Sequence, residues 1–197
     1  MKIRAFIILL LFSFSSCTFI RFITTVKDPQ NENQNDNQQY VLSLGFDTTF
    51  SYQLCKSGID SLSQEKYVLS LYKYDDKYSA SVLQLRMYDH AGNFIQGWEQ
   101  CFWDLHKLGV LDSFPLKRIS HLQINYNLKL QQDISLLNIS NQSLLDTAIA
   151  YNDYVLIVYY ARWTGWFCKD LLKAAKKYVA KHQKEQNILL ILVNTSP

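Results

Sequence analysis

Two continuous apolar runs enclose an amphipathic segment near the C-terminus, and this pattern is the strongest constraint on the fold. Residues 154–160 read YVLIVYY and residues 188–193 read ILLILV, which is typical of strands buried on both faces. Between them, residues 166–183 carry one apolar stripe at helical spacing, with the lysines largely off it. The stripe consists of Leu171, Ala174, Ala175, Tyr178, Val179 and His182. Strand, crossover helix and strand predict a right-handed βαβ unit with parallel strands.

The residues before this unit extend the same alternation. Residues 133–139, DISLLNI, predict a short strand, and the sequence NQS at 141–143 predicts the cap of a helix over 144–150. The sequence therefore predicts an α/β region over 133–197, within a chain that is α+β overall.

The segment 161–169, ARWTGWFCK, directly follows the strand predicted over 154–160. With the helix and strand before it, this segment resembles the first helix, central strand and W-C-G-P-C-K loop of the thioredoxin-fold family. The resemblance rests on Ala161, Trp163, Gly165 and the pair Cys168-Lys169, which fall in family order. It covers the whole α/β region and implies a thioredoxin-like βαβαβ segment at the C-terminus.

The same alignment departs from the family at the reactive thiols. Thr164 stands at the position of the nucleophilic cysteine. Phe167 stands at the resolving position, unless a one-residue insertion brings Cys168 there. Disulfide exchange requires one thiol that attacks and another that releases the mixed disulfide, so the resemblance implies a region without that catalysis. Cys168, near a helix N-terminus, stays a candidate thiol, with Cys55 or Cys101 as possible partners in an oxidising compartment. A buried, inert cysteine is the alternative.

The end of the sequence adds a further expectation. A thioredoxin fold would continue with a helix, a cis-proline strand, a further strand and a final helix, whereas this sequence ends at Pro197. A sheet of two or three strands with exposed edges is a liability. We therefore expect strands from 40–132 to complete the sheet, with a partner chain or a truncated gene product as the alternatives.

The region 40–132 is expected to be rich in antiparallel strands. Alternating runs at 79–88 and 94–98 flank the turn sequence DHAGN and predict a hairpin. Further elements are predicted as strands over 67–74 and 119–130 and as a short helix over 103–111. The region contains no arrangement of residues that indicates catalysis, and no metal or cofactor site is expected.

The first 17 residues, MKIRAFIILLLFSFSSC, have the three parts of an export signal. Lys2 and Arg4 give a basic start, and residues 5–14 are apolar but too few to span a bilayer. The end, FSSC, resembles a bacterial lipobox with Phe in place of the usual Leu. By this resemblance residues 1–16 are removed and Cys17 is lipidated. A cleaved signal without lipid, an uncleaved anchor and a cytosolic protein are the alternatives.

The signal also accounts for most of the net charge. The full chain has a formal charge of +3, and loss of Lys2 and Arg4 leaves +1, so no nucleic-acid partner is expected. Residues 29–39, PQNENQNDNQQ, have no apolar side chains to bury. They predict a flexible segment within a membrane tether over 17–39.

These features predict an exported lipoprotein of the cell envelope, held to a membrane through lipidated Cys17 on the periplasmic or surface side. Its thioredoxin-like region would be non-catalytic and would serve as a binding or accessory module for a protein partner in the envelope. Two alternatives stay open. One is a thiol-dependent redox or thiol-capture protein that uses Cys168 with Cys101 or Cys55, and the other is a truncated or decayed gene product.

Overall fold

The computed structural model describes residues 27, 31–63, 73–74, 77–78, 82–99, 114 and 127–196. The described helices are α3 Gln34–Ser43, α4 Lys56–Ser63, α5 Leu130–Ile134, α6 Gln142–Ala150 and α7 Trp166–His182, with a 3₁₀ turn η3 at Arg162–Thr164. The described strands are β1 Ser51–Gln53, β2 Lys73–Tyr74, β3 Lys77–Tyr78, β4 Gln84–Asp89, β5 Phe94–Glu99, β6 Tyr154–Tyr160 and β7 Ile188–Asn194. Among these described helices, none is long and apolar enough to cross a membrane.

Five of the described strands form one mixed sheet in the order β1-β7-β6-β4-β5. β1, β7 and β6 are parallel, whereas β4 is antiparallel to both β6 and β5. The predicted βαβ unit is confirmed as β6, α7 and β7, with Tyr154 opposite Ile188 and Tyr160 opposite Asn194. β1, β4 and β5 come from the region 40–132, so that region completes the sheet within the same chain, as expected. The two predicted regions thus share one sheet, and the α/β class is confirmed.

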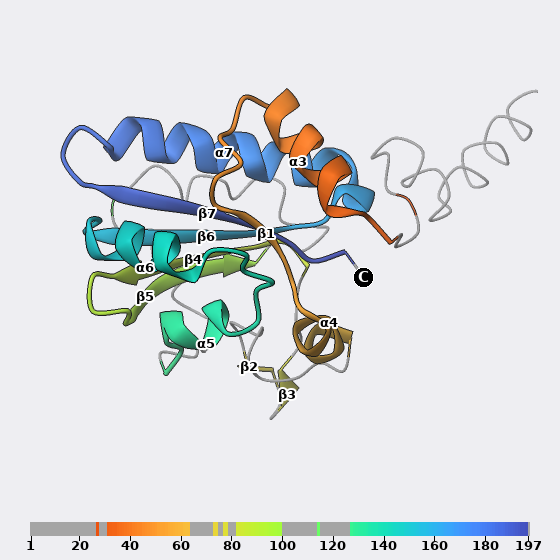
Figure 1. The fold of residues 1–197 in the computed structure, drawn as a ribbon, viewed down its shortest axis with the longest axis horizontal. Coiled ribbons are helices and arrows are strands. Elements are labelled where there is room, and N and C mark those ends of the chain that lie inside the picture. The colour runs from red at the N-terminus through yellow and green to blue at the C-terminus, as the bar shows by residue number, and fades with distance from the viewer. Residues whose placement is uncertain are drawn as a thin grey trace, which may run out of the picture.

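Helices cover both faces of this sheet, with α3 and α7 on one side and α5 and α6 on the other (Figure 1). The side chains of β6 alternate between the two cores. Leu156, Val158 and Tyr160 pack on the α7 side, whereas Val155 and Ile157 pack on the α6 side. Both faces of β6 are buried, which explains why its sequence is apolar without interruption.

Short polar contacts fix the ends of two predicted elements. Oδ1 of Asn141 caps α6 by accepting a hydrogen bond from the backbone N–H of Leu144 at 3.1 Å. In the β4–β5 turn, the carboxylate of Asp89 accepts from the backbone N–H of Asn93 at 2.7 Å. Gly92 in that turn has a φ of 74°, a conformation that favours glycine. The predicted hairpin and the helix predicted over 144–150 are both confirmed.

The expectation of a flexible tether is wrong for residues 34–39, which form the first turns of α3. Oδ1 of Asn33 caps this helix by accepting from the backbone N–H of Asp36 at 2.8 Å. Asn37 within the polar run and Val41 just after it are the buried residues of α3. Val41 and Phe46 lie in the same core as α7. The lack of apolar residues therefore predicted disorder for a stretch whose apolar packing residues lie just beyond it.

The strand predicted over 133–139 is also wrong, because α5 covers its start and turns follow. Oε1 of Gln132 caps the start of α5 by accepting a hydrogen bond from the backbone N–H of Lys129 at 2.9 Å. The buried carboxylate of Asp133 accepts a hydrogen bond from Arg86 of β4 at 2.6 Å, a long-range contact that the apolar pattern does not reveal. Several predicted elements lie outside the described residues: the export signal, most of the strand over 67–74, the helix over 103–111 and residues 119–126 of the strand over 119–130. The prediction of that strand is wrong at its described end, where Lys129 makes only an isolated bridge to Asn93 and Leu130 begins α5.

Candidate functional site

The carboxyl ends of the three parallel strands meet at one edge of the sheet, where open α/β sheets bind their ligands. Gln53 ends β1, Asn194 ends β7 and Tyr160 ends β6, and the three residues are paired in register. The segment that resembles the thioredoxin loop continues from Tyr160. This edge therefore gathers polar side chains from β1, from β7 and from the residues after β6.

The segment before α3 lies across this edge and places Glu32 in it. The backbone oxygen of Glu32 accepts from Nε2 of Gln53 at 2.6 Å, and its carboxylate accepts from Nδ2 of Asn194 at 3.0 Å. Nε of Arg162 lies 4.0 Å from the same carboxylate, and the Glu32 side chain is only 9% exposed. We call Glu32, Gln53, Arg162 and Asn194 the carboxyl-edge site. A carboxylate of the chain itself thus occupies this polar edge.

η3 and the start of α7 carry the motif that resembles the thioredoxin loop. Thr164 is buried, and its hydroxyl donates to the backbone oxygen of Ala161 at 2.6 Å. Gly165 follows with a φ of 63°, a left-handed conformation that glycine adopts without steric penalty. The hydroxyl at the expected position of the nucleophile therefore points into the fold and closes the turn.

Cys168 lies in the first turn of α7 and is completely buried in the core that α7 shares with α3. Its Sγ accepts a hydrogen bond from the hydroxyl of Tyr40 at 3.7 Å. The guanidinium of Arg162 lies 5.3 Å from the centre of the Tyr40 ring. Burial raises the pKa of the Cys168 thiol to about 12, and the charge of Glu32 acts in the same direction. A helix N-terminus favours a thiolate, but burial dominates here, so the thiol stays protonated at neutral pH.

The structure brings part of the predicted set of site residues together. Trp163 is half-buried in η3, and Phe167 is buried in the core next to Cys168. Thus the motif residues form one junction between β6 and α7, but they do not expose a thiol. The other two cysteines of the prediction, Cys17 and Cys101, lie outside the described residues.

Cys55 is the remaining described cysteine, and it directly precedes α4, on the side of the sheet opposite α7 (Figure 1). Its Sγ lies 3.0 Å from Oγ of Ser57. Burial raises the pKa of this thiol, but hydrogen bonds from the Ser57 hydroxyl and from the backbone N–H groups of Ser57 and Gly58 outweigh it and lower the pKa overall. Cys55 and Cys168 are both free thiols, so no disulfide joins them.

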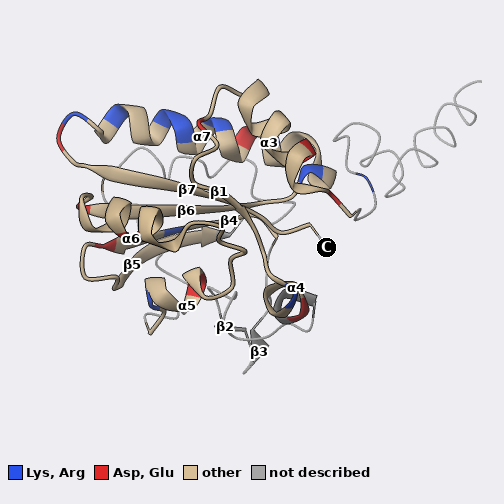
Figure 2. Cartoon of the chain, viewed as in Figure 1, with Lys and Arg blue, Asp and Glu red and all other residues tan. Residues whose placement is uncertain are grey.

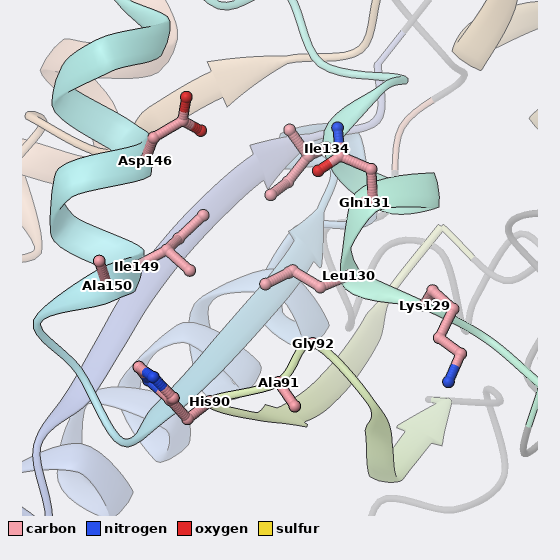
Figure 3. Close-up of a pocket in the computed structure, with 10 residues that line it drawn as sticks. All are labelled: His90, Ala91, Gly92, Lys129, Leu130, Gln131, Ile134, Asp146, Ile149 and Ala150. Carbon is pink, nitrogen blue, oxygen red and sulfur yellow. The ribbon is translucent and has the colours of Figure 1, made fainter.

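A second candidate site is a surface pocket of about 540 Å³ between the β4–β5 turn, α5 and the end of α6. Leu130, Ile134 and Ile149 point toward one another and form its floor (Figure 3). We call it the hairpin pocket; the residues that line it are labelled in Figure 3. Its volume falls within the range of small-molecule sites, which also combine an apolar floor with a few polar groups.

Basic and acidic side chains surround this apolar floor. Nδ1 of His90 lies 3.2 Å from the backbone oxygen of Asn152. Nζ of Lys129 donates to Oδ1 of Asn93 at 2.7 Å. Asp146 supplies a carboxylate from α6, across the pocket from Lys129 (Figure 3). The hairpin pocket can therefore hold a ligand with an apolar body and polar groups at its ends.

Sequence patterns do not single out the residues of either site. Glu32 lies in a polar run that predicts a tether, and Lys129 and Asp146 are ordinary exposed charges on short elements. One local signal exists: Asn33 stands three residues before Asp36, a spacing typical of a helix cap. That signal locates the start of α3, and it does not show that Glu32 reaches the edge of the sheet.

Within the part of the chain that the structure describes, no three His, Cys, Asp or Glu side chains are placed to hold a metal ion. Comparisons of the chain with protein-family models, with curated proteins and with solved structures found no match. The geometry of the carboxyl-edge site, of Cys168 and of the hairpin pocket is therefore the basis for a functional proposal.

Proposed function

We propose that the chain is an exported, lipid-anchored protein of the cell envelope, whose thioredoxin-like region binds a ligand or partner and does not exchange disulfides. The burial of the thiol supports the proposal that this region does not catalyse disulfide exchange. Cys168 is completely buried, beside a Thr164 whose hydroxyl is hydrogen-bonded into the fold. Disulfide exchange begins with an accessible thiolate, and neither residue offers one.

The order of the strands supports the thioredoxin-like part of the proposal. The resemblance implies a βαβ unit followed by two further strands, and here the hairpin β4–β5 lies beside β6 of such a unit. The hairpin precedes the unit in the sequence, so we interpret the fold as a permuted arrangement of the same parts. Val82 and Leu83 lead into β4, so this strand lacks the proline that the resemblance implies at the substrate-holding loop.

The export and lipid anchor rest on the sequence of residues 1–17. Mass spectrometry of the full chain, purified from the membrane fraction of a bacterial host, tests them. We expect a species that starts at Cys17 and carries lipid on that residue. Cys17→Ser should lose the lipid. A wild-type chain that retains residues 1–16 would contradict the lipoprotein assignment.

The absence of thiol catalysis is tested with an insulin-reduction assay on the purified protein. We expect no activity above the background of the reductant, and the same result for Cys168→Ser. Activity in the wild type that Cys168→Ser abolishes would refute the non-catalytic proposal. A thiol count on the folded protein, with and without reductant, serves as the control for oxidised cysteines.

The hairpin pocket is the site that we assign to ligand binding, because it combines a suitable volume with an apolar floor and a mixed-charge rim. Ligand-detected NMR with a set of small aromatic carboxylates and amines tests it. Ile149→Trp should fill the pocket and remove binding. Leu144→Trp, at an exposed position of the same helix, should retain it. Absence of any binder, or equal binding by both variants, would exclude this pocket as the site.

A thiol-capture function is the second candidate, and the environment of Cys55 favours it. This thiol is only half-buried, and its pKa is lowered by hydrogen bonds at the start of α4. Incubation of the wild type with glutathione disulfide tests this function. Rapid formation of one mixed disulfide that Cys55→Ser abolishes and Cys168→Ser retains would support thiol capture at Cys55. An unmodified wild-type chain would contradict it.

A further inference from the structure

We propose that the outer side of α7 docks the folded part of the protein onto an anionic lipid surface. This inference rests on the proposed membrane anchor at Cys17. It adds a second contact, through which the protein would lie against the bilayer in one orientation. We call the docking surface the α7 lysine face. It consists of Trp166, Lys169, Lys173, Lys177 and Lys181 of α7, together with Lys184 in the turn that follows.

The amphipathic pattern of α7 separates this face from the core. Phe167, Leu171 and Tyr178 are among the residues that α7 buries against the sheet. Lys169, Lys173, Lys177 and Lys181 recur every four residues, so they follow one side of the helix, and all are exposed. Figure 2 shows the basic residues along the outer side of α7. The helix therefore presents a basic stripe to its surroundings.

Two charged residues of α7 do not add positive charge to the docking surface. Nζ of Lys176 donates to the backbone oxygens of Leu44 and Gly45 at 3.2 and 2.6 Å, so this lysine holds the loop after α3. Asp170 is the only acidic residue of α7. Its carboxylate accepts a hydrogen bond from the indole of Trp166 and lies near Lys169 and Lys173. It therefore offsets part of the positive charge at the start of the stripe, and the lysines leave the stripe net positive.

The charge of this stripe contrasts with that of the chain as a whole. The chain without residues 1–16 has a formal charge of only +1, so acidic residues elsewhere in the chain offset the five lysines of this face. Basic side chains attract anionic lipids within about one Debye length, which is about 10 Å at 0.1 M salt. A flat array along a helix of about 25 Å suits a flat, negatively charged surface.

Trp166 adds an observation that favours a membrane over a soluble polyanion. It is the first residue of α7 and is 44% exposed, although an indole ring is largely apolar. Trp166 precedes Lys169 by three residues and Lys173 by seven, so it lies on the lysine side of the helix. Tryptophan favours the boundary between lipid and water, and the lysines beside Trp166 would add attraction to anionic lipid headgroups.

The entry point of the tether places this face next to the bilayer. The backbone N–H of Lys27 donates to the backbone oxygen of Trp163 at 2.7 Å, so the chain from the anchor reaches the folded part close to Trp166. Ten residue steps separate Cys17 from Lys27, and they span at most about 36 Å. A lipidated Cys17 would therefore keep the start of α7 within reach of the membrane surface.

Fluorescence quenching on vesicles tests the docking separately from the anchor. The full chain is reconstituted with vesicles of phosphatidylcholine alone, or with added phosphatidylglycerol, each containing brominated lipid as the quencher. Flotation measures anchoring. Tryptophan quenching measures contact, and Trp166→Phe identifies the ring responsible. We expect flotation with both vesicles, but quenching only with phosphatidylglycerol and at low salt.

Matched substitutions test the role of the lysines. The triple variant Lys169→Gln, Lys173→Gln and Lys177→Gln should lose the quenching, because each lysine near an anionic surface changes the docked-to-free ratio about fivefold. The corresponding triple arginine variant keeps the charge and should retain quenching. Lys56→Gln removes an exposed lysine of α4 and should also retain it. Glutamine, lysine and arginine have similar helix propensities, so α7 itself is preserved.

The outcomes separate the two proposals. Flotation without quenching in phosphatidylglycerol vesicles would overturn the docking and leave the anchor in place. Quenching that the triple glutamine variant retains would also overturn it. Failure to float with phosphatidylcholine, together with salt-sensitive flotation and quenching with phosphatidylglycerol, would support the docking and contradict the anchor.

Discussion

Arg86 and Asp133 form an ion pair that the fold encloses completely. Nη1 of Arg86 lies 2.6 Å from Oδ1 of Asp133, and neither side chain is exposed. Tyr88 donates its hydroxyl to the other carboxylate oxygen, and Nη2 of Arg86 donates to Oε1 of Gln84 at 2.7 Å. The pair ties β4 to α5 on the α6 side of the sheet. The two charges are tolerated because hydrogen bonds replace the lost water.

Removal of one member of this pair should destabilise the protein strongly. We expect Asp133→Ala to lower the free energy of unfolding by about 3–5 kcal/mol, because the Arg86 charge would stay buried without its partner. The double variant Arg86→Met, Asp133→Leu should lose less than Asp133→Ala, because it leaves no buried charge without a partner. Urea denaturation of the two variants measures this order. A loss of less than about 1 kcal/mol for Asp133→Ala would show that the pair contributes little.

Local sequence patterns predicted the βαβ unit and the β4–β5 hairpin. The apolar runs of β6 and β7 and the stripe of α7 gave the βαβ unit, because burial on both faces dictates an apolar sequence. The turn with Gly92 gave the hairpin, because its conformation restricts the residue types. The place of β1, β4 and β5 in one sheet followed only as an expectation, since strand order depends on contacts between distant segments.

The candidate sites depend on such distant contacts, so the sequence did not predict them. Outside these sites the same holds for Asp133, which lies in an apolar stretch that favours a strand but is part of the helix α5 and pairs with Arg86 of β4. Glu32 lies in a polar run, yet it is held by Asn194, 162 residues away. Cys168 has the position of a reactive thiol, but only the packing of α3 over α7 shows that it is buried.

The two described cysteines should differ in reactivity. Burial raises the pKa of Cys168 to about 12, whereas hydrogen bonds lower the pKa of the half-buried Cys55. At neutral pH, iodoacetamide should therefore modify Cys55 and leave Cys168 unmodified until the protein unfolds. Peptide mass spectrometry before and after addition of urea measures both. Equal rates in the folded protein would show that Cys168 is accessible.

The raised pKa of Cys168 also predicts how stability depends on pH. Between the ordinary value of 9.0 and about 12, the folded chain retains the thiol proton that the unfolded chain releases. The free energy of unfolding should therefore fall as pH rises through this range, by at most about 1.4 kcal/mol per pH unit from this group. Below that range its contribution is constant.

Cys168→Ala separates this effect from those of the tyrosines that titrate in the same range. The variant should lose stability to a similar extent at every pH below 9.0, because its cavity does not titrate. Urea denaturation at about pH 8 and about pH 10 should then show a shallower fall for Cys168→Ala than for the wild type. Parallel falls would mean that Cys168 does not carry the raised pKa.

The cap of α3 should matter although the sequence around it is typical of a linker. Oδ1 of Asn33 accepts from the backbone N–H of Asp36 at 2.8 Å, so Asn33→Ala should destabilise the helix by about 1 kcal/mol. Asn33→Ser keeps a capping oxygen and should stay close to the wild type. Hydrogen exchange at Val41 measures the opening of α3. Equal protection in the two variants would indicate that packing alone holds the helix.

The contact between Glu32 and Asn194 should hold the N-terminal segment against the edge of the sheet. Asn194→Asp would replace a donor to Glu32 by a second carboxylate, and the repulsion should release the segment that begins at Lys27. Trypsin should then cleave after Lys27 at least about 10-fold faster than in the wild type, because cleavage follows the population of the open segment.

A swapped pair provides the control for this prediction. The double variant Glu32→Gln, Asn194→Asp places the amide and the carboxylate on opposite partners, so the hydrogen bond can form again. Cleavage after Lys27 should return toward the wild-type rate, although each residue differs from the original. If Asn194→Asp alone leaves cleavage unchanged, Glu32 is not what fastens the segment. If the double variant is cleaved as fast as Asn194→Asp, the added charge acts through another neighbour of Asn194.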